Sequence, residues 1–168
     1  YVFQLTGDPR ILLAVIKTIE DRQKVEPDTL RGMVRVILVV EDSPSFYSAY
    51  LPIIYTEVME QTRRLMAERI NEVDRMSRMR ARPKILLARS YQEATALFDR
   101  YKKYILGVIT DMRFPRDAVL ADDAGLDFIR SVQSEKRDIP ILLQSAEPAQ
   151  RALAQKLGVE FADKNSRE

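Results

Sequence analysis

The sequence predicts an α/β protein built on a doubly wound parallel sheet of five strands. From residue 34 onward, short runs rich in valine, isoleucine and leucine alternate with longer segments whose apolar residues recur every three or four positions. The short runs are typical of strands buried on both faces of a parallel sheet, and the longer segments are typical of covering helices. Most of the short runs end at acidic or hydroxyl residues, which is where ligands bind in such sheets.

The first 32 residues are predicted to form an appendage of one strand, one helix and a linker. Residues 1–6 have the pattern of a strand, and a helix is expected over residues 9–24 because Asp8 and Pro9 form a typical helix start. Its inner face would consist of Ile11, Leu12, Val15, Ile16 and Ile19, and its wet face of Arg10, Lys17, Asp21 and Arg22. Residues 25–32 are expected to be a linker. The appendage must dock on this domain or on a second copy, because it exposes unpaired backbone and an apolar stripe.

The first strand of the sheet is expected at residues 34–40, followed directly by Glu41 and Asp42. A long helix is then predicted from residue 45 to about residue 79, because this segment has almost no helix breakers and keeps its apolar residues at helical spacing. Such a helix would be about 50 Å long, which exceeds the diameter of a compact domain. We therefore expect its distal half to contact a partner, and we expect a kink at Pro52.

The remaining elements continue the alternation. Strands are predicted at residues 84–88, 105–111, 139–143 and 159–162. Helices are predicted at residues 91–104, 125–132 and 148–157, with Gly158 as a natural end of the last one. Residues 116–124 are expected to be a polar loop. Five strands joined by four helices imply right-handed crossovers.

Composition excludes several classes of site. The chain has no cysteine and no histidine, so thiolate and imidazole metal ligands are absent and any divalent cation must be held by oxygen. The formal net charge of +2 gives no general attraction to nucleic acid or to a membrane. The basic segment between Arg63 and Arg82 has no interleaved aromatic residue, so nucleic-acid binding is not favoured there. No apolar run reaches the length of a membrane span, and we expect a cytoplasmic protein.

Polar side chains at the carboxyl ends of the predicted strands form the candidate site. They are Glu41, Asp42, Asp111, Ser145 and Lys164. Three crowded carboxylates raise one another's pKa unless a cation intervenes, and an all-oxygen site suits Mg²⁺. With that cation bound, Asp111 can act as a nucleophile toward an activated phosphoryl group while the lysine neutralises the transferring oxygens. Taken alone, Asp111 fits an acid that only caps a loop at the end of a strand as well as it fits a site residue. Its four partners make it a site candidate.

Four separated motifs complete the pattern: Ile37-Leu38-Val39-Val40-Glu41-Asp42-Ser43, Asp111-x-x-Phe114-Pro115, Ser145-Ala146 and Lys164. This combination resembles the receiver domain of two-component response regulators and covers residues 34–164. The resemblance implies a flavodoxin-like sheet with strand order 2-1-3-4-5, in a receiver domain over residues 33–168 with an elongated first helix.

The resemblance also implies a role for each site residue. Asp111 would accept a phosphoryl group from a histidine kinase or a phosphotransfer protein, and Ser145 and Lys164 would bind that group. The ligands of Mg²⁺ would be Glu41, Asp42, Asp111 and the main-chain carbonyl of Met112. Phe161 matches the aromatic switch position. The domain would relay a conformational signal to an output domain outside this chain, and it would not be an enzyme beyond its own Mg²⁺-dependent phosphorylation.

Several features depart from the family pattern. Arg113 lies two residues after the acceptor, where it could pair with the phosphoryl group, or with Asp42 in its absence, and so modulate the site. Asn165 replaces the usual proline. Residues 1–32 resemble the end of a preceding receiver-like domain, and the long helix is similar to receiver modules fused to phosphoenolpyruvate-synthase-like proteins.

Two other functions are alternatives to the phospho-acceptor. The first is a non-phosphorylated pseudo-receiver that acts as a dimerisation or scaffold module, since a homodimer through the long helix is expected in either case. The second is an enzyme, which fits poorly: an aspartate-nucleophile phosphatase would need a second acid where Arg113 stands, and Glu41 and Asp42 would repel a nucleotide phosphate.

Overall fold

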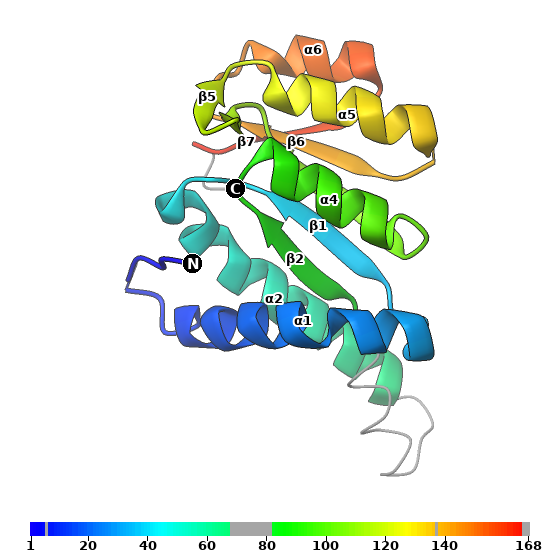
Figure 1. The fold of residues 1–168 in the computed structure, drawn as a ribbon. Helices are drawn as coiled ribbons and strands as arrows, with labels where there is room; N and C mark the ends of the chain where they lie inside the picture. The colour runs from blue at the N-terminus through cyan, green and yellow to red at the C-terminus, as the bar shows by residue number, and fades with distance from the viewer. Residues whose placement is uncertain (6, 68–81, 137, 166–168) are drawn as a thin grey trace. The chain divides into compact units, whose positions relative to one another are not determined.

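The computed structural model describes residues 1–5, 7–67, 82–136 and 138–165, and it contains one five-stranded sheet (Figure 1). The strands are β1 (Val36–Val40), β2 (Lys84–Ala88), β3 (Ile105–Asp111), β6 (Ile141–Ser145) and β7 (Glu160–Asp163). Their spatial order is β2-β1-β3-β6-β7, with β3 parallel to β6 and β6 parallel to β7. Counted within this sheet alone, the order is 2-1-3-4-5, so the predicted fold class is confirmed.

Helices connect the strands as expected. They are α2 (Pro44–Ala67), α4 (Tyr91–Tyr101), α5 (Ala124–Glu135) and α6 (Gln150–Leu157), and α1 (Ile11–Gly32) precedes the sheet. Within the described residues, no helix is long and apolar enough to cross a membrane. The chain divides into two compact units, residues 1–36 with 44–86 and residues 37–43 with 87–168, which we describe separately.

The first unit corrects the expectation of an N-terminal strand. Residues 1–5 are not a strand, because side chains of α2 rather than a neighbouring strand bind their backbone. The Tyr47 hydroxyl donates a hydrogen bond to the Val2 carbonyl, and the Gln4 N–H donates to Ser48 Oγ at 3.0 Å. The Phe3 ring packs edge-on against the Tyr47 ring. Side-chain hydrogen bonds and ring packing therefore hold the segment without β pairing.

Helix α1 runs eight residues further than predicted, so the linker expected at residues 25–32 is wrong. The reason is that its buried face is half polar: Ile11, Ala14, Thr18, Asp21, Val25 and Thr29. Because Val25 and Thr29 remain buried on either side of Pro27, packing outweighs the hydrogen bond that this proline cannot make. Apolar periodicity selected the wrong face, since Asp21 was expected on the wet side.

Asp21 anchors α1 through a buried ionic network within the first unit. Its carboxylate is fully buried and accepts hydrogen bonds from Arg82 at 2.6 and 3.0 Å and from the Ile85 N–H at 2.9 Å. The Tyr55 hydroxyl donates to it at 3.3 Å, and Lys84 Nζ lies 3.8 Å away. A buried carboxylate with this many donors is compensated in place, so α1 docks on this chain's own α2 and on the start of β2.

Helix α2 is described only as far as Ala67. The rest of the predicted long helix, residues 68–79, lies outside the described residues, so neither its length nor a dimer through it is tested. Pro52 lies inside α2, where its carbonyl accepts a hydrogen bond from Thr56 Oγ1 at 2.7 Å.

The second unit contains a hairpin where a polar loop was expected. Strands β4 (Phe114–Arg116) and β5 (Val119–Ala121) pair antiparallel. They are joined by Asp117 and Ala118, whose φ angles of 51° and 64° are those of a two-residue hairpin turn. Side-chain hydrogen bonds hold the hairpin: Gln92 donates to Asp117 Oδ1 at 2.7 Å, and Arg116 donates to an Asp127 oxygen at 2.9 Å.

An aromatic cluster forms the core beneath this hairpin. The Phe128 ring packs edge-on against the rings of Phe98 and Tyr91 at centroid distances of 6.3 Å. Tyr91 also stacks on Phe114 and carries the Arg116 guanidinium over its face at 4.3 Å. These contacts join α4, α5 and β4, so the chain that follows Asp111 is packed rather than loose.

Candidate functional site

The five predicted site residues all belong to the second unit, where each stands at or just after a strand. Glu41 and Asp42 follow β1, Asp111 ends β3, Ser145 ends β6 and Lys164 follows β7. Strand pairing sets this arrangement, because Asp111 is in register with Gln144, and Ser145 with Asp163. The Lys164 N–H also donates to the Ser145 carbonyl at 3.0 Å.

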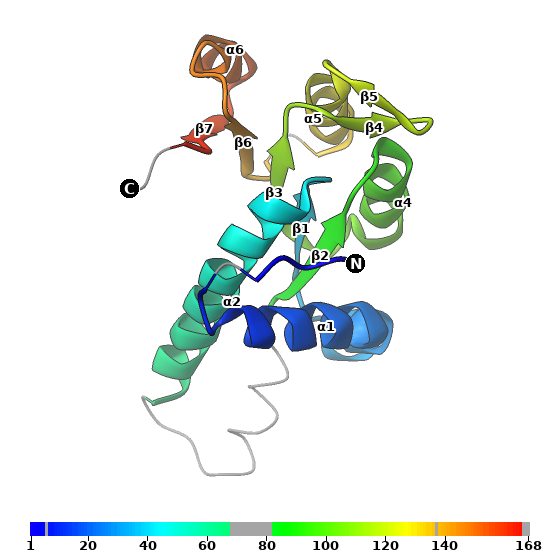
Figure 2. The same cartoon turned by 90° about the vertical axis from the view of Figure 1, so that its left-hand side faces the viewer.

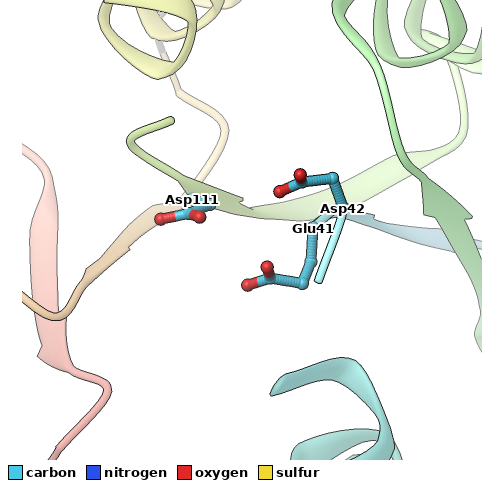
Figure 3. A group of neighbouring side chains, drawn as sticks. All are labelled: Glu41, Asp42 and Asp111. Carbon is cyan, nitrogen blue, oxygen red and sulfur yellow. The ribbon is translucent and has the colours of Figure 1, made fainter. Parts of the chain in front are cut away.

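Three carboxylates converge at this edge of the sheet. Glu41, Asp42 and Asp111 each place one oxygen within 4.8 Å of the others, and Figure 3 shows the side chains extending from the ends of β1 and β3 toward a common region. Octahedral Mg²⁺ with ligands at about 2.1 Å separates its oxygens by about 3 to 4 Å. The donor set therefore fits a hard cation after a small closure, and no other kind of ligand atom is required.

Lys164 compensates the acidic cluster. Its ammonium lies 2.5 Å from Glu41 Oε2 and 2.8 Å from Asp111 Oδ2, and it is almost completely buried. One cation against three carboxylates leaves the cluster with an excess of negative charge. A divalent cation would remove that excess.

Burial is the main cause of the raised pKa values in this cluster. Burial raises the pKa of Glu41 to about 7, and the nearby charge of Asp111 adds to the effect, while Lys164 opposes it. Burial also raises the pKa of Asp42. Without a metal ion, Glu41 and Asp42 therefore bind protons more readily than exposed carboxylates do.

The backbone after Asp111 is also fixed. The Met112 N–H donates to Asp111 Oδ1 at 2.7 Å, and the Met112 carbonyl accepts from the Gly125 N–H at 2.9 Å. A carbonyl oxygen has two lone pairs, so Met112 retains one for a metal ion. The role of this carbonyl as a metal ligand stays a prediction.

Gly125 is a positioning residue that sequence reasoning treated only as a helix start. A Cβ at this position would lie 2.3 Å from the Asp111 carbonyl oxygen and 2.8 Å from Met112 Cα. Only glycine therefore allows the first turn of α5 to lie against the end of β3. A glycine at the start of an amphipathic helix was the available signal, but the contact that requires it appears only in three dimensions.

Ser145 and Phe161 both lie where β6 and β7 meet α6. The buried Ser145 Oγ accepts a hydrogen bond from the Glu147 N–H at 3.1 Å, which leaves its own hydroxyl hydrogen to donate. The Phe161 ring carries the Arg151 guanidinium at 4.9 Å. The switch role of both residues stays a prediction.

Arg113 and Asn165 have partners that the sequence did not reveal. Arg113 is 49% exposed, and it pairs with Glu147 at 3.3 Å and with Asp122 at 3.8 Å, not with Asp42 as was considered. These exposed acids neutralise the guanidinium without removing it from water. The Asn165 side chain donates to the Ala146 carbonyl at 3.0 Å, and its N–H donates to Asp163 at 2.8 Å, a bond that proline could not make.

Solved response regulators share this architecture. The structure matches TrrA from Thermotoga maritima, solved in complex with Mg(2+)-BeF, over 80% of this chain and 90% of that one, with a TM-score of 0.50 and 21% identity. It also matches a receiver domain protein from Clostridium thermocellum (79% and 84% covered, TM-score 0.46, 22% identity) and the chemotaxis protein CheY4 of Vibrio cholerae (80% and 89%, 0.48, 16%). No family model and no curated protein matches the sequence. The chain therefore has the receiver-domain fold.

Proposed function

We propose that this chain is a phospho-acceptor receiver domain in which the Asp111 carboxylate is the nucleophile. The observation that carries the proposal is the position of Lys164, whose ammonium lies between Glu41 and Asp111 at the edge where the carboxylates converge. A bare acid cluster suggests only cation binding. When a buried ammonium also lies beside the acid that acts as nucleophile, that ammonium can neutralise charge on a transferring phosphoryl group.

The residues divide the chemistry as follows. Glu41, Asp42, Asp111 and the Met112 carbonyl would hold Mg²⁺, which supplies positive charge to the phosphoryl oxygens. An Asp111 oxygen forms a bond to phosphorus while the bond from phosphorus to the donor's nitrogen breaks, and the electron pair departs with that nitrogen. Lys164 transfers its contact from the carboxylate to a phosphoryl oxygen, and the Ser145 hydroxyl donates to another.

The donor in this proposal is a histidine kinase or a phosphotransfer protein, and the signal passes to an output domain outside this chain. A phosphoryl group adds charge beside Ser145, which would draw the β6–α6 loop toward Asp111. Phe161 lies beside α6 and would respond to that movement.

The test is phosphorylation by acetyl phosphate with Mg²⁺, followed by intact mass spectrometry. We expect the wild-type chain to gain one phosphoryl group and Asp111→Asn to gain none. Asp122→Asn removes an exposed carboxylate of the following loop and is the matched control, which should be modified normally. A wild-type chain that is never modified with Mg²⁺ present would contradict the proposal and favour the pseudo-receiver.

A further inference from the structure

Helix α1 presents an exposed face with heptad spacing, which we call the outer seam. Its positions are alternately four and three residues apart: Leu12, Ile16, Ile19, Gln23, Glu26 and Leu30 in the helix, followed by Met33, the left-handed C-cap residue. The five apolar members are 65, 61, 48, 63 and 72% exposed in that order. A repeat of 3.5 residues is the spacing that packs one helix along another. Exposed apolar residues grouped at both ends of the seam are typical of an interaction surface.

The rotation of α1 is fixed, so the outer seam cannot turn inward. Asp21 lies on the opposite face, where it is fully buried and bonded to Arg82 and to the Ile85 N–H. Turning the seam toward the core would break the ion pair between this carboxylate and the Arg82 guanidinium. Unpaired buried charges strongly destabilise a folded protein.

The order of polarity along the outer seam is palindromic. From Ile16 to Met33 it reads apolar, apolar, polar, polar, apolar, apolar. An antiparallel second copy, centred between Lys24 and Val25, therefore places each of these six positions opposite a position of the same polarity. Ile16 faces Met33 of the second copy, Ile19 faces Leu30, and the Gln23 amide can donate to the Glu26 carboxylate. Two-fold symmetry repeats each pair.

We propose that the outer seam is the interface of a homodimer in which two α1 helices pack antiparallel. The parallel arrangement is disfavoured because it places Glu26 against Glu26 of the second copy, while the antiparallel one also opposes the helix dipoles. A 22-residue helix is about 33 Å long, so the contact is at the small end of specific interfaces and the dimer should dissociate on dilution. This surface is independent of Asp111 and of the proposed function.

Sedimentation velocity over a dilution series of the full chain tests the interface. We expect a reversible monomer–dimer equilibrium that Ile19→Glu and Leu30→Glu each weaken by about tenfold to a hundredfold. Ile53→Glu, which replaces an exposed isoleucine of α2, is the matched control and should leave the equilibrium unchanged. A chain that stays monomeric throughout, or a control that weakens the dimer equally, would overturn the proposal.

The register has a separate test because the native chain contains no cysteine. Ile19→Cys and Leu30→Cys chains are oxidised alone and after mixing. The antiparallel register places residue 19 beside residue 30 of the second copy and separates the two copies of residue 19 by about 16 Å, so the mixed disulfide should predominate. Predominant self-disulfides, or no disulfide at all, would overturn the arrangement.

Discussion

The ammonium nitrogen of Lys164 lies 2.5 Å from Oε2 of Glu41, a carboxylate that the fold buries completely. This pair places a positive charge inside a cluster of three acids and determines how the metal-free site behaves.

Glu41→Gln should stabilise the metal-free protein at pH 8 but not at pH 4. The pKa of Glu41 is raised to about 7 by burial, so the folded state loses stability as the pH rises from about 4.5 to about 7, and the loss is complete above that range. Removing the charge should recover up to about 3 kcal/mol at pH 8. Urea denaturation with a chelator measures the difference.

The control is Glu135→Gln, which neutralises an exposed glutamate that pairs with Lys102; its effect should stay within about 0.5 kcal/mol. Adding Mg²⁺ should raise the free energy of unfolding of the wild-type chain more than that of the Glu41→Gln variant. Equal stability of Glu41→Gln and wild type at pH 8 would show that the buried charge is compensated by other means.

Lys164→Met should increase Mg²⁺ affinity by about tenfold while it slows phosphorylation by at least about a hundredfold. The ammonium contacts two of the carboxylates and repels a second cation, so its removal favours the metal. The same removal deprives the phosphoryl oxygens of a charge partner. Calorimetric titration and the rate of modification by acetyl phosphate measure the two effects, with the exposed Lys156→Met as control. A variant that loses Mg²⁺ affinity as well as phosphorylation rate would contradict the expected role of Lys164.

Gly125→Ala should destabilise the protein by about 2 to 4 kcal/mol and weaken Mg²⁺ binding, because its Cβ would collide with the backbone of Asp111 and Met112. Gly32→Ala is the matched control: its Cβ would meet only Val34 Cγ2 at 3.4 Å, and it should be neutral or stabilising by up to about 1 kcal/mol. Thermal melts with and without Mg²⁺ separate the two effects. A normal metal affinity in Gly125→Ala would remove the positioning role.

Asp21→Asn should destabilise the first unit by about 3 to 5 kcal/mol, because the Arg82 guanidinium would remain buried beside an uncharged amide. Hydrogen exchange should show faster exchange along α1. Asp8→Asn changes a partly exposed aspartate paired with Arg10 and should have little effect. If both substitutions behave alike, the Asp21 network is not what holds α1 in place.

Most of the sheet and the grouping of the site residues could be predicted from local patterns. Short apolar runs identified every strand of the main sheet, and parallel topology places the residues after those strands at one edge. The approach of Glu41, Asp111 and Lys164 follows from that topology, although their distances do not.

The hydrophobic pattern gave wrong predictions where polar side chains occupy buried positions. The buried face of α1 contains Thr18, Asp21 and Thr29, so hydrophobic periodicity chose the exposed face and ended the helix at Lys24. Residues 1–5 are held by side chains of α2, which no strand pattern reveals. Arg113 had no visible partner in the sequence, because Asp122 and Glu147 reach it only through the fold.

The hairpin of β4 and β5 makes the chain after Asp111 lose its conformational entropy during folding. Gln92 and Asp127 bind it from two helices, and Tyr91 stacks beneath it. The segment after Asp111 is therefore ordered when the protein folds, not when a ligand arrives. In the proposed function, a phosphoryl group on Asp111 would then carry little ordering cost on this side of the site, and the remaining cost would fall on the loop that begins at Ser145.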